Sequence, residues 1–117
     1  MNKPVRVILI DEARVTFEKL NTIVGDQKQG NSFETQLLKS IKEKVSLIKQ
    51  NPFYGDNVQK KLIPKKYQNK VQNLWRVELN NFWRMLYTIR GDEIEIVCFV
   101  LEIMNHKKYN KLFGYGK

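Results

Sequence analysis

The sequence predicts an α+β domain in which two N-terminal helices pack on one face of a mostly antiparallel four-stranded sheet. Three observations lead to this fold class. A short β-branched run opens the chain, two amphipathic helical stretches follow it, and three strand-like segments come last. The predicted order is therefore strand, helix, helix and three strands. Because 117 residues is close to the commonest domain size, residues 1–117 are predicted to form a single domain.

The first half of the chain predicts one strand and two helices. Residues 5–10 are a β-branched run, and Asp11 is placed to cap a helix that ends before Gly25. The second helix is predicted to begin at Asn31, where an asparagine three residues before a glutamate matches a capping box. Pro52 predicts the end of this helix, since proline cannot continue it.

The second half predicts three strands after a lysine-rich connection. Residues 53–73 have no clear period, so we expect an exposed connection with one short extended piece at residues 61–63. Residues 74–90 alternate between polar and apolar and predict a hairpin with a tight turn at residues 80–81. Residues 94–103 are apolar on both faces, which predicts a central strand.

Alternation in the hairpin assigns its side chains to two faces, because successive side chains of a strand point in opposite directions. Arg76, Glu78 and Arg84 share one face, which is predicted to stay open. Glu95 and Glu102 in the last strand are predicted to be charges at the rim of the sheet. The side chains predicted to face the helices are Trp75, Val77, Leu79, Met85, Tyr87 and Ile89.

Composition excludes several classes of protein. No apolar run approaches the roughly 20 residues that span a bilayer, and the N-terminal residues do not form a signal peptide. The single cysteine, Cys98, lies in an apolar run, so we expect core packing, no intrachain disulfide and a reducing cytoplasm. There is no glycine-rich phosphate loop, zinc-ligand spacing or nucleophile elbow, and we predict neither a cofactor nor a metal.

Positive charge is concentrated in the second half of the chain. The net charge is +9 overall, with +2 in residues 1–56 and +7 in residues 57–117. One-sided basic segments attract polyanions, and the composition leaves nucleic acid and an acidic protein partner equally open. The residues predicted to contact nucleic-acid phosphates, which the resemblance described next implies are those of RNA, are all lysines: Lys60, Lys61, Lys65, Lys66, Lys70, Lys108 and Lys111.

Three sequence patterns resemble the RelE/ParE superfamily of type II toxin–antitoxin toxins. They are WRxxY at residues 83–87, NHKKY at residues 105–109 and NPFYG at residues 51–55. The order of predicted elements resembles that superfamily as well. The resemblance implies a small basic protein whose sheet forms a groove, and whose partners are a cognate acidic antitoxin, messenger RNA and the ribosome.

The resemblance also implies a reaction. Ribosome-dependent members cleave messenger RNA by attack of a ribose 2′-hydroxyl on the adjacent phosphate. That reaction needs a base, an acid and cations that stabilise the phosphorane, and it requires no metal. ParE-like relatives instead inhibit DNA gyrase without cleaving RNA.

Individual roles follow from positions that match the family. Arg84 and Arg76 would stabilise the phosphorane, since a planar guanidinium suits a phosphate that gains charge. His106 or Lys107 would protonate the leaving oxygen, and Tyr109 would orient the nucleotide.

Glu78 departs from the family pattern, because some ribosome-dependent members have a lysine there. It could serve as the base, or it could pair with a neighbouring arginine and neutralise the groove. We therefore carry two further hypotheses beside the endoribonuclease. One is a non-cleaving module, either a ParE-like gyrase inhibitor or a solitary nucleic-acid-binding relative. The other is a retained fold that only docks an acidic antitoxin.

Overall fold

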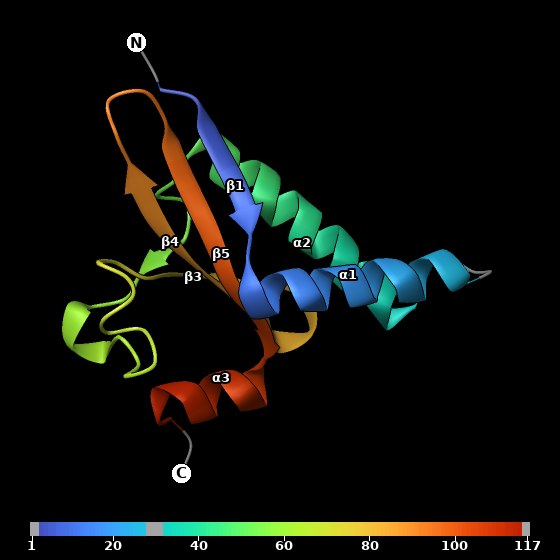
Figure 1. The fold of residues 1–117 in the computed structure, drawn as a ribbon. Helices are drawn as coiled ribbons and strands as arrows, with labels where there is room; N and C mark the ends of the chain where they lie inside the picture. Colours follow the sequence, from blue (N-terminus) through green and yellow to red (C-terminus); the bar gives the residue numbers. More distant parts are fainter. Residues whose placement is uncertain (1–2, 28–31, 116–117) are drawn as a thin grey trace.

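The structure is a computed structural model that describes residues 3–27 and 32–115 of the chain. It contains a five-stranded sheet with strand order β1-β5-β4-β3-β2 (Figure 1). The strands are β1 (Val5–Leu9), β2 (Asp56–Asn57), β3 (Trp75–Glu78), β4 (Trp83–Gly91) and β5 (Ile96–Asn105). The helices are α1 (Asp11–Asp26), α2 (Phe33–Gln50) and α3 (His106–Phe113), with one-turn 3-10 helices η1 (Lys60–Leu62) and η2 (Asn80–Phe82).

The sheet is mostly antiparallel, as predicted. β5 pairs antiparallel with β4, β4 with β3, and β3 with β2, whereas β1 lies parallel to β5 at one edge. The α+β class and the two N-terminal helices are confirmed, and β2 adds a fifth strand to the predicted four. β2 was missed because it has only two residues, too few to show a period.

The helix face of the sheet carries the larger core, and the predicted inward residues lie there. Val77, Leu79, Met85 and Tyr87 are buried in it, and Trp75 and Ile89 pack against it half-buried. α1 and α2 supply the other side of this core through Ala13, Leu20, Leu37, Leu38, Ile41 and Ile48. Cys98 is buried in it too, as predicted.

The opposite face is not open, and this prediction was wrong. Residues 58–73 and α3 lie on it (Figure 1), and apolar side chains from both elements pack against the sheet. Burying these side chains removes apolar surface from water, which stabilises the fold by about 25 cal/mol for each Å² buried. The predicted extended piece at residues 61–63 is instead η1 and the residue after it. This second core contains Ile63, Tyr67, Leu74, Leu86, Leu101, Met104 and Tyr109.

Helix ends differ in detail from the prediction. The side chain of Ser32 caps α2 by accepting a hydrogen bond from the backbone N–H of Thr35 at 3.1 Å. The predicted cap at Asn31 lies outside the described residues. Asp11 does not cap α1: it is the first helical residue, and the helix continues through Gly25 to Asp26.

The hairpin turn is longer than predicted. In place of a two-residue turn at residues 80–81, η2 joins β3 to β4, and Leu79 donates its N–H to the carbonyl of Trp83 at 2.8 Å. Asn81 and Phe82 have φ values of 57° and 65°, in the left-handed region. Asparagine adopts that region readily, whereas a bulky residue such as phenylalanine seldom does.

A β-bulge interrupts the pairing of β5 with β4. Leu86 lies opposite Glu102 and Tyr87 opposite Val100, so Leu101 is an extra residue in β5. As a result Leu101 and Glu102, although adjacent in sequence, both lie on the face covered by residues 58–73.

None of the helices in the described ranges 3–27 and 32–115 has the length and apolar character that crossing a bilayer requires.

Candidate functional site

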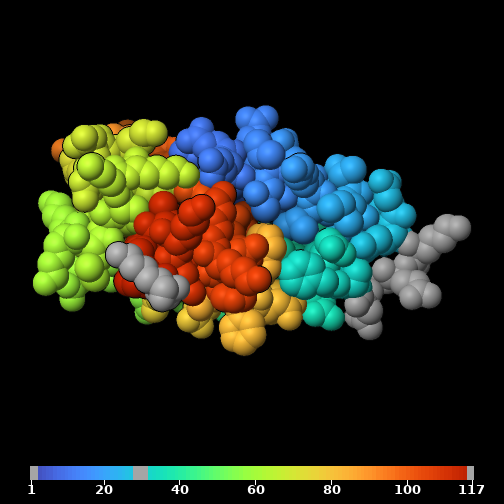
Figure 2. Space-filling view, turned by 90° about the horizontal axis from the view of Figure 1, so that it is seen from below, coloured from blue at the N-terminus to red at the C-terminus, as the bar shows by residue number. Residues whose placement is uncertain are grey.

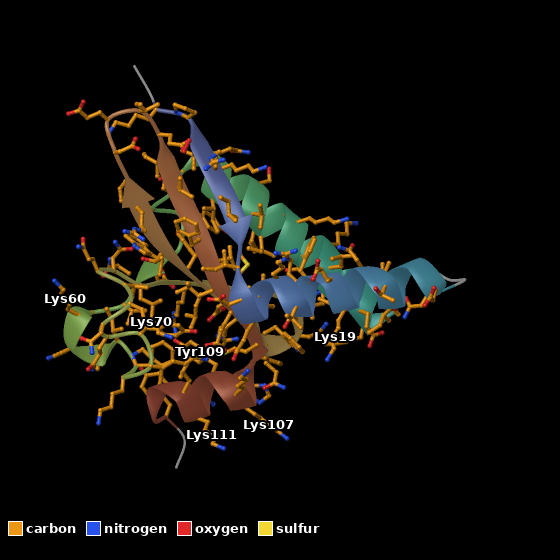
Figure 3. The ribbon with its side chains drawn as sticks, in the orientation of Figure 1. Lys19, Lys60, Lys70, Lys107, Tyr109 and Lys111 are labelled. Carbon is orange, nitrogen blue, oxygen red and sulfur yellow. The ribbon has the colours of Figure 1, made fainter. Side chains whose placement is uncertain are left out.

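Two arginines and a tyrosine meet on the face covered by residues 58–73. Arg76 in β3 donates from Nη1 to the hydroxyl of Tyr109 in α3 at 3.0 Å. The guanidinium carbons of Arg76 and Arg84 lie 5.9 and 5.5 Å from the centroid of the Tyr109 ring. Tyr109 is only 4% exposed, so it is a buried support for both cations. Figure 3 shows it between α3 and the sheet.

Local sequence explains this convergence. Arg84 lies opposite Glu78 in β3 and opposite Met104 in β5, so period-2 geometry gives both arginines the same face. Asn105 ends β5 and caps α3, accepting a hydrogen bond from the N–H of Lys108 at 2.9 Å. Because the cap fixes where α3 begins, Tyr109 falls in its first turns, directly over the arginines.

We call Arg76, Arg84 and Tyr109 the arginine pair site. Its acidic neighbours are weak partners. Asp56 lies 3.6 Å from Arg76 Nε, and Glu78 lies 3.8 Å from Arg84 Nη2. Both carboxylates are well exposed, and long ion pairs of this kind contribute about 0–1 kcal/mol. The guanidinium groups therefore keep donors for another anion.

Arg84 is the more enclosed of the two arginines. Its side chain is 17% exposed, and Nη1 donates to the backbone carbonyl of Trp83 at 3.3 Å. Among the described residues its buried Nε has no hydrogen-bond partner, which is costly unless a ligand supplies one. The hydrogen bond to Tyr109 raises the pKa of Arg76 despite partial desolvation, so this group stays cationic.

His106 and Lys107 open α3 and are both exposed. The His106 ring meets that of Phe82 edge-on, with centroids 5.9 Å apart and an interplanar angle of 68°. Lys107 and Lys111 project from the side of α3 that faces away from the sheet (Figure 3). The structure thus brings four of the six predicted catalytic residues together, namely Arg76, Arg84, Glu78 and Tyr109. Of the other two, His106 lies against Phe82 at the start of α3, and Lys107 projects away from the sheet.

The predicted RNA-binding lysines fall into two groups. Lys60 and Lys61 are exposed in η1, and Lys65 is exposed three residues after it. Lys70 is also exposed, and Figure 3 shows it nearer the sheet than Lys60. Lys66 and Lys108 instead form ion pairs with acids, described next. Lys111 is exposed on α3.

Glu102 is a buried, hydrogen-bonded acid whose role the sequence did not predict. It is 2% exposed, not a rim charge as predicted. Its carboxylate accepts hydrogen bonds from Tyr67 and from Lys66, the latter at 2.7 Å, and lies 3.5 Å from Lys108 Nζ. The bulge turned it to this face. The sequence did contain a signal for this network, namely an acid within the most apolar strand. A buried carboxylate needs hydrogen-bond or cationic partners, so its position could have indicated them.

The Glu102 network affects the pKa values of its members. Burial lowers the pKa of Lys66, but the hydrogen bond and charge of Glu102 outweigh it, and the net pKa is raised. Burial, and then Glu102, raise the pKa of Tyr67. Glu12 of α1 joins the network at 3.4 Å from Lys66. A cavity of about 500 Å³ adjoins these residues, with Phe99 and Val71 among its apolar lining.

Metal-ligating residues do not cluster in the described part of the chain. No group of three or more histidine, cysteine, aspartate or glutamate side chains within residues 3–27 and 32–115 is placed to hold a metal ion.

The fold and the site define a small basic α+β protein that presents two supported guanidinium groups on one face of its sheet. Two solved structures share this fold. A YoeB/ParE toxin from Agrobacterium tumefaciens aligns over 86% of this chain and 98% of its own, with 14% identity and a TM-score of 0.57. A double arginine-to-alanine mutant of the E. coli toxin RelE in the free state aligns over 95% and 92%, with 11% identity and a TM-score of 0.57.

The fold of this chain is therefore that of the RelE/ParE toxins, as the sequence resemblance implied. No protein-family model and no curated protein sequence matches the chain.

Proposed function

We propose that this protein is the toxin of a type II toxin–antitoxin system and that it cleaves messenger RNA on the ribosome. The observation that carries this proposal is the arginine pair site. Two guanidinium groups are held around a buried tyrosine, and their nearest carboxylates are exposed and lie 3.6 and 3.8 Å away, at the long end of ion-pair distances. A phosphate is the anion that such a planar, multi-donor arrangement suits best.

In the proposed reaction the ribose 2′-oxygen attacks the adjacent phosphorus, and the bond from phosphorus to the 5′-oxygen breaks. The proton of the 2′-hydroxyl passes to a base, and the departing 5′-oxygen takes a proton from an acid. The products are a 2′,3′-cyclic phosphate and a 5′-hydroxyl. Arg84 and Arg76 stabilise the charge that builds up on the phosphorane, which is a large share of such catalysis.

Glu78 and His106 supply the proton transfers in this proposal. Glu78 is exposed and lies 3.8 Å from Arg84, so its carboxylate would lie beside a phosphate that Arg84 binds. His106 is exposed at the start of α3, and a histidine side chain can act as a general acid in such a reaction. His106 is favoured over Lys107 because Lys107 projects away from the sheet (Figure 3).

The partners follow from charge. The exposed lysines Lys60, Lys61, Lys65 and Lys111 would contact ribosomal RNA, whose phosphates dominate such binding. An acidic antitoxin would neutralise the net charge of +9. Action on ribosomes places the protein in the cytoplasm.

The test compares Arg84→Ala and Arg84→Lys with a matched control, Arg14→Ala. Arg14 is an exposed arginine in α1 whose pair with Glu18 is an ordinary surface contact. Each chain is expressed from a tightly controlled promoter, and growth and the ends of cut messages are recorded. We expect the wild type and Arg14→Ala to arrest growth and cut messages at ribosome-bound sites. Arg84→Ala should lose at least about 100-fold in cleavage, with Arg84→Lys intermediate because it keeps charge without the planar donors.

A second candidate is the non-cleaving inhibitor of DNA gyrase. The observation that favours it is the register pairing of Glu78 with Arg84, which partly satisfies one cation of the pair. It predicts growth arrest with intact messages and with loss of DNA supercoiling by purified gyrase. That outcome would overturn the endoribonuclease.

A further inference from the structure

Phe82 is held in an unusual and exposed position. It is 70% exposed, and its φ of 65° lies in the left-handed region, directly after Asn81 at 57°. A bulky side chain adopts that conformation only at a cost in free energy, and an exposed aromatic ring gains little from packing within its own chain. The strain and the exposure together indicate that the ring serves a contact outside the fold.

Hydrogen bonds on both sides fix the turn that presents Phe82. Leu79 donates to the carbonyl of Trp83 at 2.8 Å, and Asn80 donates to the hydroxyl of Ser40 in α2 at 3.2 Å. Trp83 turns the other way, to pack on the helix-face core beside Phe33. Phe82 is therefore directed outward by a constrained backbone. Figure 2 shows the segment around residue 80 protruding beside α3.

His106 makes Phe82 part of a two-ring surface. The rings come from separate elements, η2 and α3, and meet edge-on at 5.9 Å with both residues exposed. An edge-on pair leaves each ring at least one face that the other does not cover. We call Phe82 and His106 the aromatic corner.

The aromatic corner adjoins the arginine pair site. Arg84 donates to the carbonyl of Trp83, the residue next to Phe82, at 3.3 Å. His106 lies in the same helix as Tyr109, and both guanidinium groups lie within 5.9 Å of the centroid of the Tyr109 ring. A phosphate held by Arg84 would thus place its neighbouring nucleotide against the aromatic corner.

We propose that the aromatic corner is a stacking site for one nucleobase of single-stranded RNA, next to the phosphate held by Arg84. This rests on the proposed action on RNA. Unstacked RNA bases bind proteins largely by stacking on phenylalanine, tyrosine, tryptophan or histidine rings, with cations at the backbone. The larger ring system of a purine covers more of such a surface, so the site favours a purine over a pyrimidine.

The test measures binding of a short fluorescent single-stranded RNA by the full chain at low salt. The variants are Phe82→Leu, which keeps apolar volume without a ring, and Phe82→Tyr, which keeps the ring. Phe53→Ala is the control, since Phe53 is 62% exposed but packs beside Trp75 on another part of the surface. Urea unfolding of each variant checks the fold.

We expect Phe82→Leu to lose about tenfold in RNA affinity, with Phe82→Tyr and Phe53→Ala close to the wild type. An RNA that lacks one base should bind the wild type more weakly than the intact RNA, and the two should bind Phe82→Leu alike. On ribosome-bound messages, the preference of the wild type for cuts beside a purine should be lost in Phe82→Leu.

Two results would overturn the stacking site in different ways. If Arg84→Ala abolishes RNA binding and cleavage while Phe82→Leu changes neither affinity nor the cut positions, the corner is not a base site and the proposed function stands. If the wild type neither binds the RNA nor cuts messages, the proposed function fails with it. Loss of affinity for the antitoxin alone in Phe82→Leu would reassign the corner to protein docking.

Discussion

The carboxylate of Glu102, in the middle of β5, accepts a hydrogen bond from the hydroxyl of Tyr67, in the connection between η1 and β3. Lys66 adds a second bond to the same carboxylate at 2.7 Å. Lys108 approaches it from α3 at 3.5 Å. One buried acid therefore joins the connection and α3 to the sheet, and α3 is the helix that contains Tyr109 of the arginine pair site.

Replacing Glu102 should loosen the connection. Glu102→Ala leaves Tyr67 and Lys66 without their buried acceptor, and we expect a loss of about 2–4 kcal/mol in the free energy of unfolding. Glu102→Gln keeps an acceptor for Tyr67 and should lose less. Urea unfolding measures both, and trypsin should cut residues 58–73 faster in the alanine variant. Glu95→Ala is the control, because its ion pair with Arg6 lies at the surface with both side chains partly exposed, and such pairs contribute at most about 1 kcal/mol. Equal losses at Glu95 and Glu102 would contradict this account.

Stability should fall at alkaline pH. Burial raises the pKa of Cys98 from 9.0 to about 11, and burial, partly offset by the N–H of Gly55, raises that of Tyr87 from 10.0 to about 12. The folded state holds these protons at a pH where the unfolded chain releases them. This stabilisation is complete below the ordinary pKa values and disappears as the pH rises toward the folded ones.

The measurement for this prediction is the free energy of unfolding as a function of pH above 9. Each pKa unit corresponds to about 1.4 kcal/mol. The slope should decrease in Cys98→Ala and in Tyr87→Phe, whatever their absolute stabilities. An unchanged slope in both variants would show that other groups cause the alkaline loss.

Gly55 should not tolerate a side chain. A Cβ at this position would lie 2.7 Å from the backbone oxygen of Arg76 and 3.0 Å from the Tyr87 ring. We expect Gly55→Ala to cost about 1–3 kcal/mol and to displace the strand that carries Arg76. Gly25→Ala is the matched control, since a Cβ there meets nothing within 4 Å. Because Gly25 lies in α1, Gly25→Ala should raise the free energy of unfolding by about 0.5–1 kcal/mol. Thermal unfolding of both variants checks the prediction, which fails if their melting temperatures shift in the same direction.

Tyr109→Phe separates the two contacts that Tyr109 makes. The variant keeps the ring beneath both guanidinium groups but loses the hydroxyl that accepts from Arg76 at 3.0 Å. We expect about 1 kcal/mol less stability. If the protein cleaves RNA as proposed, the cleavage rate should also fall about tenfold, because Arg76 is no longer held in place. Tyr115→Phe, at an exposed tyrosine, is the control. Full cleavage by Tyr109→Phe would show that the Arg76 guanidinium needs no such anchor.

Much of the fold could be predicted because the hairpin obeys simple periodicity. Met85 and Tyr87 face the helices, and Arg76 and Arg84 share the other face, as alternation required. What alternation cannot supply is the path of the chain beyond the strands. Tyr109 reaches the arginines only because α3 folds back over the sheet, which depends on the Asn105 cap and on contacts far apart in sequence.

The misses share a physical cause. The connection looked structureless because residues 58–73 form only short turns and no continuous helix or strand, yet Ile63, Tyr67 and Val71 cover the sheet. Glu102 looked peripheral because the effect of a bulge is invisible to a strict period of two. Tertiary packing decided both cases.

The bulge has a consequence for changes in chain length. β5 contains one residue more than its partner needs, because Leu101 has no opposite residue in β4. Losing one residue there would restore plain alternation and leave Ile103, Met104 and α3 on their present sides. The register of β3 with β4 has no such surplus, so the same loss in that hairpin would turn the arginines inward. Single-residue deletions should therefore survive in β5 and abolish folding in the hairpin.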